Sequence, residues 1–186
     1  LDDTGDLPDP EVRAVLNTKP DSETVPIKTE LTEKTKNNFS DPDLNLPDDP
    51  FILIRHPGVK KIYNQGMTAI INKNYEQAIE VFENFTKRFP NDLDSDNAFY
   101  WIGRSQLELN ELEKAESSFR KVLKLYEHRP TTQGYKTPDA IYMLGKISER
   151  RRDPVASKYY FRTVIARYPG SVAARNAPRD LDRLSQ

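Results

Sequence analysis

The feature that most constrains the fold is an internal repeat. Three glycines are each followed sixteen positions later by a phenylalanine, twelve positions later by a small side chain and nineteen positions later by an apolar one. The glycine–phenylalanine pairs are Gly66 and Phe82, Gly103 and Phe119, and Gly145 and Phe161. Successive glycines are separated first by thirty-seven and then by forty-two positions, so the second junction carries extra loop. Self-similarity with a period of about 20 to 50 residues is typical of helical repeat proteins.

Each repeat unit reads as two antiparallel helices. A glycine lets the second helix approach the first closely, and the phenylalanine fills the space beside it. Pro90 and Pro169 close two of the units, because a proline ring clashes with the preceding helical turn. In the middle unit the proline is Pro130, which stands three positions later in its repeat than Pro90 and Pro169 do in theirs. We expect helices near residues 58–72, 75–88, 95–109, 111–126, 138–151 and 154–168, with turns at Lys73-Asn74, Asn110 and Arg152-Asp153.

The end of the chain predicts one more helix. Ser171 is an N-cap residue that follows a helix stop at Gly170. A thin apolar stripe then covers the open end of the array, as a helical repeat protein requires. Pro178 is expected to kink or restart this helix. The stripe is made of Val172, Ala177, Leu181 and Leu184.

The first 50 residues differ from the rest. They hold 13 acidic and 5 basic side chains, a net charge of −8, whereas residues 51–186 hold 16 and 23, a net charge of +7. Half of the 14 prolines lie in the same 50 residues. Such a segment is too polar and too proline-rich to bury a core of its own. We therefore expect an extended acidic arm over residues 1–50.

Residues 51–56 form an apolar docking segment between the arm and the repeats. The run Phe51-Ile52-Leu53-Ile54 lies between Pro50 and Pro57 and is too short for a helix. It either packs on the first helix pair, because exposed apolar runs are unfavourable, or serves as a strand or short motif for a partner. The repeat domain with its capping helix then covers residues 57–186.

The sequence gives no support for an enzyme, a cofactor or a metal site. The chain has no cysteine, and its seven glycines are too scattered to form a phosphate-binding loop. His56 and His128 lie in separate loop-like contexts without a partner. No apolar run approaches the roughly 18 residues that span a bilayer. Because the chain begins at Leu1 and not at a methionine, we expect a processed or trimmed product, and a secretion signal or lipid-anchored cysteine upstream stays open.

Two charge clusters have a structural interpretation. Asp92, Asp94 and Asp96 lack the glycine and the bidentate glutamate of a hand-type calcium loop. They are expected to cap the helix that begins near Ser95, where negative charge is favourable. The run Arg150–Arg152 ends a helix and has no interleaved aromatic residues, so we expect a solvated helix end and no nucleic-acid partner.

Several short sequence segments resemble those of a known family. They are Asn74–Ile79 with Phe82, Arg88–Asn91, Ala98–Gly103, Thr137–Ala140 with Leu144-Gly145, and Arg167–Ser171 with Ala173-Ala174. Over residues 57–184 the chain resembles tetratricopeptide repeat (TPR) domains, and it is most similar to the Tol-Pal-associated periplasmic proteins of the YbgF/CpoB type. Outer-membrane lipoproteins of the BamD type are the second resemblance. Unlike the first family, residues 1–50 show no heptads of a trimerising coiled coil.

The resemblance implies an all-α fold. It is a right-handed α-solenoid of three TPR-like helix pairs with a C-terminal capping helix, preceded by the acidic arm. It also implies a non-catalytic scaffold for protein partners in the bacterial envelope, in the periplasm or on the periplasmic face of the outer membrane. The implied task is linking Tol-Pal to cell-wall synthesis during division. The alternatives are outer-membrane protein assembly, or a structural part of a motor or secretion apparatus whose arm wraps a neighbour. Oligomer formation stays open.

Counting from each glycine predicts the residues that line a partner-binding groove. They are Tyr63, Tyr100 and Tyr142 three residues before it, Met67, Arg104 and Lys146 one residue after it, and in addition Asn97 and Arg150. Rigid aromatic rings would supply contact area, and the cations would fix the register of a bound peptide. In the alternative interpretation the tyrosines only pack between helices. The charge split further suggests that the arm lies on the basic groove of its own or a neighbouring chain.

Overall fold

The computed structural model describes residues 58–126 and 136–185, whose regular structure is helical throughout. The helix bounds are α2 (Val59–Ile71), α3 (Tyr75–Arg88), α4 (Ser95–Glu108), α5 (Leu112–Tyr126), α6 (Thr137–Arg150), α7 (Pro154–Arg167) and α8 (Val172–Arg183). Each end of the six predicted repeat helices lies within one residue of its expected place. The arm, the Phe51–Ile54 segment and both histidines lie outside the described residues. Within these residues no helix is long and apolar enough to cross a membrane.

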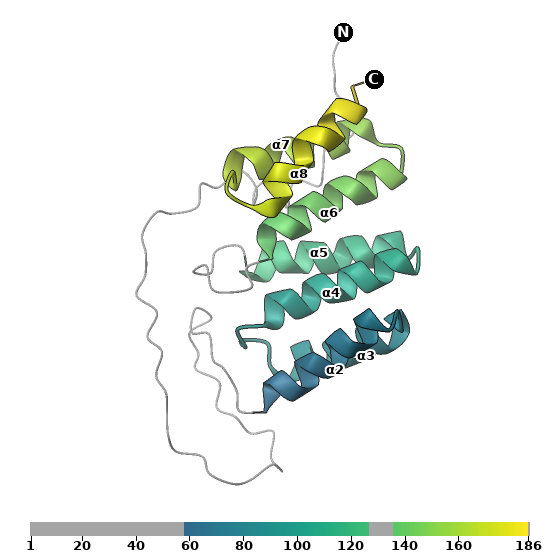
Figure 1. The fold of residues 1–186 in the computed structure, drawn as a ribbon, viewed down its shortest axis with the longest axis vertical. Helices are drawn as coiled ribbons and strands as arrows, with labels where there is room; N and C mark the ends of the chain where they lie inside the picture. Colours follow the sequence, from purple (N-terminus) through teal and green to yellow (C-terminus); the bar gives the residue numbers. More distant parts are fainter. Residues whose placement is uncertain (1–57, 127–135, 186) are drawn as a thin grey trace, which may run out of the picture.

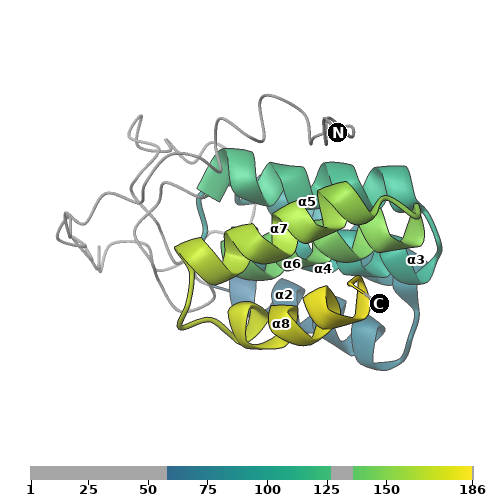
Figure 2. The same cartoon turned by 90° about the horizontal axis from the view of Figure 1, so that it is seen from above.

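The helices stack as three antiparallel pairs in two layers (Figure 1). The first helices α2, α4 and α6 form one layer, and the second helices α3, α5 and α7 form the other. Seen from above, α2 and α8 stand further out than α4 and α6, so the layer of first helices lines the hollow side of the array (Figure 2). We call this side the inner face. The predicted all-α solenoid is thereby confirmed.

The glycine–phenylalanine pairs are the contact points within each helix pair. A Cβ atom on Gly66 would lie 2.6 Å from Cζ of Phe82, and one on Gly145 would lie 2.6 Å from Cε1 of Phe161. Both phenylalanines are fully buried. Ser157 replaces the alanine of the other two pairs, and its hydroxyl donates a 2.9 Å hydrogen bond to the carbonyl of Gly145. The close approach therefore depends on the absence of a glycine side chain, as predicted.

Each helix pair turns on a left-handed residue that lies seven positions after its glycine. Lys73, Asn110 and Arg152 have φ angles of 59°, 60° and 60°. In the first turn the N–H of Lys73 donates to the carbonyl of Ile70 (3.0 Å), and the next N–H donates to that of Ala69 (2.9 Å). Both bonds recur at the other two turns. This is the Schellman arrangement, which usually has glycine at the left-handed position.

The last helix departs from the prediction in two ways. Ser171 caps it as expected, accepting a 3.0 Å hydrogen bond from the N–H of Ala174. However, Val172 is 59% exposed, whereas Ala173 is buried beside Ala177. The inward stripe thus begins one residue later, in the register that Ala177 sets. Pro178 lies on the exposed side and neither restarts nor ends α8, which continues through it to Arg183.

Candidate functional site on the inner face

The three predicted tyrosines pack within their own helix pairs. Their ring centroids lie 5.4 Å (Tyr63 and Phe82), 5.7 Å (Tyr100 and Phe119) and 5.3 Å (Tyr142 and Phe161) apart. Such tilted or edge-on contacts contribute about 0.5–1.5 kcal/mol beyond the area that they bury. The most enclosed of the three, Tyr100, is 8% exposed. Most of the predicted aromatic surface is therefore already in contact with the protein itself.

Two of the tyrosines also join one first helix to the next. The Tyr63 hydroxyl on α2 is hydrogen-bonded to Trp101 on α4. The Tyr142 hydroxyl on α6 donates to Oδ2 of Asp180 on α8 at 2.5 Å. Burial raises the pKa of Tyr63, and burial together with Asp180 raises that of Tyr142 to about 12, so both hydroxyls stay neutral. The Tyr63 hydroxyl accepts the bond from the Trp101 indole N–H, which can only donate, whereas the Tyr142 hydroxyl donates. These bonds fix the register of successive first helices.

Asp180 is the centre of an ionic network that holds α8 against α6. It is 1% exposed and accepts hydrogen bonds from Lys146 (3.2 Å) and Arg183 (2.8 Å). Both cations also pair with Glu149. Burial alone would raise the pKa of Asp180, but the bonds from Tyr142 and Lys146 outweigh it and lower that pKa. Lys146 and Tyr142, predicted to meet a partner, are thus engaged with the chain's own last helix.

The acidic cluster near α4 acts differently from the prediction. The N-cap residue Asp94 makes no side-chain capping bond. Asp96 instead accepts hydrogen bonds from the N–H groups of Asn97 (2.7 Å) and Lys136 (2.9 Å), which ties α4 to the start of α6. Burial raises the pKa of Asp96 to about 6 despite these bonds. Asn97, predicted to line the groove, is only 7% exposed.

The arginine run at the end of α6 is not a purely solvated helix end, which corrects the prediction. Arg150 donates to the carbonyl of Leu107, at the C-terminal end of α4 (2.9 Å). That carbonyl carries the partial negative charge of a helix C-terminus. Arg151 pairs with Glu116 on α5. Both cations therefore join the third helix pair to the second, while Arg152 stays exposed.

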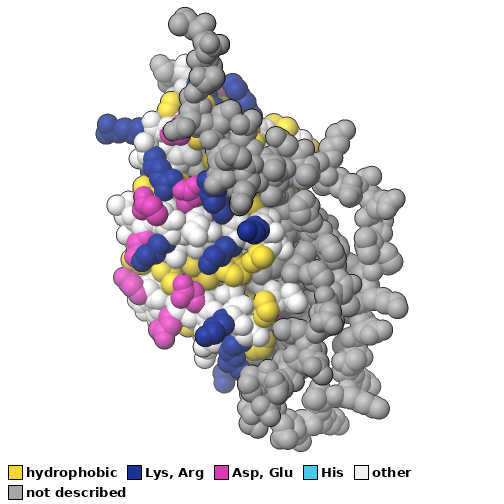
Figure 3. Space-filling model, turned by 180° about the vertical axis from the view of Figure 1, so that it is seen from behind, with side chains coloured by type: hydrophobic (Ala, Val, Ile, Leu, Met, Phe, Trp, Pro, Cys, Tyr) yellow, Lys and Arg dark blue, Asp and Glu magenta, His cyan; other side chains and the backbone are white. Residues whose placement is uncertain are grey.

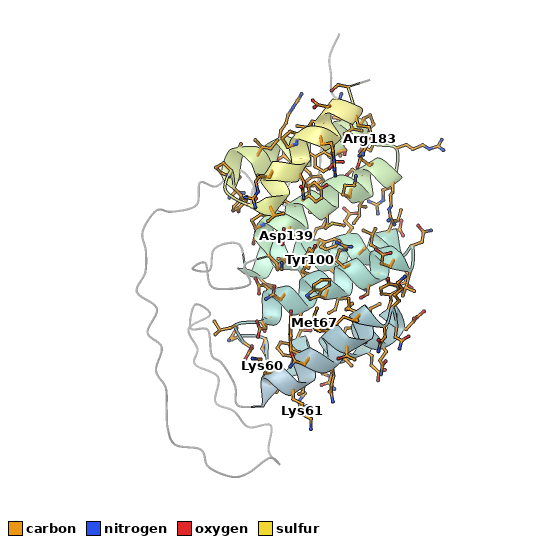
Figure 4. The ribbon with its side chains drawn as sticks, viewed as in Figure 1. Lys60, Lys61, Met67, Tyr100, Asp139 and Arg183 are labelled. Atoms are coloured by element: carbon orange, nitrogen blue, oxygen red, sulfur yellow. The ribbon has the colours of Figure 1, made fainter. Side chains whose placement is uncertain are left out.

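What remains accessible along the first helices is a narrower set, which we call the inner strip: Lys60, Met67, Arg104 and Asp139. Figure 4 shows Lys60, Met67 and Asp139 on this face, on α2 and α6. The Arg104 side chain on α4 is 37% exposed, and its guanidinium lies 3.6 Å from the Glu108 carboxylate. The Nε atom of Arg104 has no acceptor among the described residues. Nor do the residues that the structure describes contain three His, Asp or Glu side chains placed to hold a metal ion.

With the geometry in place, comparison with known proteins identifies the family. A family model described as YfiO, outer membrane lipoprotein, matches residues 56–186. The chain belongs to this family. A comparison of the YfiO-family chain with curated proteins gives no match. The family agrees with the second of the two predicted resemblances, the BamD-type lipoproteins, and the Tol-Pal connection stays a prediction.

Three solved structures are similar in fold to this YfiO-family chain. PcrH from Pseudomonas aeruginosa is 13% identical, with 72% of this chain and 96% of that chain covered and a TM-score of 0.59. The Arabidopsis OM64 TPR domain is 17% identical, with 67% and 94% covered and a TM-score of 0.54. MamA is 19% identical, with 69% and 72% covered and a TM-score of 0.52. At these identities the likeness establishes the TPR-type fold alone. Fold and family together indicate a protein-interaction scaffold.

Proposed function

We propose that this YfiO-family chain is a non-catalytic scaffold on the periplasmic face of the outer membrane, where it holds a segment of a partner during outer-membrane protein assembly. The family description supports the location, and the BamD-type resemblance supports the process. The inner strip supports the binding mode, because it places exposed polar and apolar groups on the hollow side of a rigid array. Concave surfaces of this kind are what helical repeat proteins use to bind extended segments.

The observation that carries the binding mode is the state of Arg104. Its side chain, on the central first helix α4, is 37% exposed, and its contact with Glu108 at 3.6 Å is too long for a strong hydrogen bond. Its Nε donor has no acceptor among the described residues. The Nε atom is buried, so a carboxylate of a partner would accept hydrogen bonds from the outer guanidinium nitrogens, and charge-assisted bonds of this kind contribute about 1.5–3 kcal/mol. Met67 provides an apolar contact one helix away.

The tyrosines have a supporting role in this proposal. Tyr63 and Tyr142 fix the spacing of the first helices through their hydroxyl bonds, and all three rings fill the interior of their pairs. Residues held in this way keep the inner strip in one geometry before a partner arrives. Pre-organisation lowers the entropy lost on binding.

Site-specific photocrosslinking in the native cell tests the proposal. A photoreactive amino acid replaces Met67 on α2, and in a matched control it replaces Leu125, a 47% exposed apolar residue on α5 in the opposite layer. We expect components of outer-membrane protein assembly to crosslink at position 67 and not at 125. Crosslinks to such components at position 125 alone would move the binding site away from the inner face.

A second test measures affinity for the partner that is captured. Arg104→Ala should weaken binding about tenfold, which corresponds to about 1.4 kcal/mol. Lys124→Ala, an exposed cation on α5, should leave the affinity unchanged. Equal effects of the two changes would mean that only the overall charge of the domain matters.

The Tol-Pal role is the second candidate. It is favoured by two sequence segments that resemble the YbgF/CpoB-type proteins, Ala98 to Gly103 and Arg167 to Ser171. The crosslinking experiment separates the two processes by the identity of the captured proteins. Capture of Tol or Pal proteins at position 67 would replace the assembly role with the division role and leave the binding site as proposed.

A further inference from the structure

The net positive charge of the helical domain lies in its C-terminal part, the third helix pair and α8. Residues 58–126 carry ten basic and ten acidic side chains, so their net charge is zero. Residues 136–185 carry eleven basic and five acidic side chains, a net charge of +6. The basic surface that balances the acidic arm therefore belongs to α6, α7 and α8 and not to the groove as a whole. On the face that lies behind in Figure 1, Lys and Arg side chains occur along the whole array, with Asp and Glu side chains among them, so the asymmetry is one of net charge (Figure 3).

On α7 and α8, four cations make no ion pair among the described residues. They are Lys158 and Arg162 on α7, and Arg175 and Arg179 on α8, and we call them the terminal edge. Each pair is spaced by four residues, which places its members side by side on one helix face. None of the ion pairs among described residues includes any of the four. Arg175 donates one hydrogen bond, to the carbonyl of Gly170 (2.8 Å).

The repeat itself shows which way the α7 pair faces. Counted from the glycine of each helix pair, Lys158 and Arg162 occupy the places on α7 that Glu116 and Arg120 occupy on α5. On α5 this side meets the following repeat, because Arg151 of the third helix pair reaches Glu116. The same side of α7 therefore faces the C-terminal end of the array, where α8 packs against α7.

The α8 pair faces the same end. Ala177 lies eight residues after Pro169, as Ala98 lies eight residues after Pro90, and both alanines are fully buried. In this register α8 is the first helix of a fourth unit. Arg179 then stands where the other units have tyrosine, and Asp182 where they have glycine.

These replacements decide what can bind to the end of the array. A second helix cannot pack on α8 as it does in the other units, because Asp182 occupies the place of the glycine that a close approach requires. Four cations and one carboxylate line this end instead, a net charge of +3. A polar end prevents further stacking in any solenoid, but a surplus of one sign also selects for an acidic ligand.

We propose that the acidic N-terminal segment of the same chain, residues 1–50, lies on the terminal edge. Its net charge of −8 is complementary to the edge, and residues 2–11 hold five carboxylates and no cation. The chain from Glu11 to Gly58 spans at most about 150–170 Å when extended, and about 35–40 Å on average as a flexible chain. Three helix spacings of about 10 Å separate α2 from α8, so the segment reaches the edge.

Paramagnetic relaxation in the full chain tests this contact. Because the chain has no cysteine, Thr4→Cys gives a single spin-label site within the acidic run. We expect the label to broaden backbone amide signals of α7 and α8 at least about twofold more than those of α2 and α3 at low salt. The difference should vanish near about 0.5 M NaCl, where screening shortens the Debye length to a few ångströms.

Two quadruple variants of the labelled chain identify the surface. Replacing the four cations of the terminal edge by glutamine should abolish the selective broadening. The matched control K60Q/K61Q/K73Q/K87Q removes four exposed cations from the first helix pair and should leave it intact. Unchanged helical circular dichroism shows that each variant is folded.

A mixture of labelled chains with unlabelled, isotope-enriched chains separates contact within one chain from contact between copies. Broadening confined to the labelled chain itself supports the proposal. Broadening of the unlabelled, isotope-enriched chains in the mixture would assign the edge to a neighbouring copy and overturn the proposal. Equal broadening over all helices, or loss of the effect in the control variant, would also overturn it.

Discussion

Replacing Gly145 by alanine should destabilise the protein, although alanine is the better helix former. In an open helix this change would stabilise the fold by about 1 kcal/mol. Here the added Cβ would lie 2.6 Å from Cε1 and 2.9 Å from Cδ1 of Phe161, which is fully buried. The ring must shift by about 1 Å to restore ordinary contact, and overpacking of this kind costs about 1–3 kcal/mol.

Taking the upper part of that range, because the ring has no open side, the net loss is about 2 kcal/mol. It corresponds to a fall in melting temperature of about 4–8 °C for a domain of this size. Urea unfolding measures it, followed by circular dichroism and by the fluorescence of Trp101, the single tryptophan. Gly170→Ala is the control, since nothing lies within 4 Å of the Cβ it would add. It should change the stability by no more than about 0.5 kcal/mol.

A double-mutant cycle completes the test. Phe161→Leu shortens the ring side chain, so Gly145→Ala should be less harmful in that background, with a coupling energy of about 1 kcal/mol. A Gly145→Ala protein that is as stable as the Gly170→Ala control would refute the role assigned to the glycine–phenylalanine pairs. So would a cycle in which the two effects simply add.

Three further predictions concern stability. Because burial raises the pKa of Asp96 from an ordinary value near 3.8 to about 6, the folded state holds the extra proton. The free energy of unfolding should therefore fall by up to about 3 kcal/mol as the pH rises from about 4 to about 6. Urea titrations at several pH values should show this dependence in the parent chain and its loss in Asp96→Asn. Lys73→Gly should stabilise by about 1 kcal/mol in thermal unfolding, since glycine adopts the φ of 59° without strain, whereas Asn72→Gly at a φ of −80° should not. Asp180→Ala should destabilise by about 3 kcal/mol and remove hydrogen-exchange protection from α8, because Tyr142, Lys146 and Arg183 lose the buried acceptor that joins α8 to α6. Asp182→Ala, at an exposed position, should have little effect.

The parts of the fold that the sequence predicted are those set by contacts within one repeat. Gly66 and Phe82 belong to the two helices of one pair, and their contact follows from the geometry of a single helical hairpin. The same holds for the ends of the helices, which Pro90 and Ser171 mark locally. The positions of the turns were predicted as well. Their left-handed geometry was not, because Lys73 and Arg152 stand where glycine is usual.

The parts that could not be predicted depend on how one repeat meets the next. Nothing near Asp180 in the sequence indicates that Tyr142 and Lys146 would meet it 38 and 34 residues away. Asp96 likewise finds its partner 40 residues on, at the start of α6. Regular spacing placed Tyr142 and Lys146 on the correct helix, but it could not distinguish a surface that is open from one that α8 covers.

The same joint between glycine and phenylalanine occurs in all three helix pairs, and this has a consequence for how such a gene can change. If a whole pair were duplicated or lost, each new neighbour would still carry the glycine, the phenylalanine and the left-handed turn that hold a pair together. The number of pairs is therefore open to change in single genetic steps. The contact between glycine and phenylalanine is not open to change in this way, since a substitution of either residue alone leaves the other without the side chain that fits it.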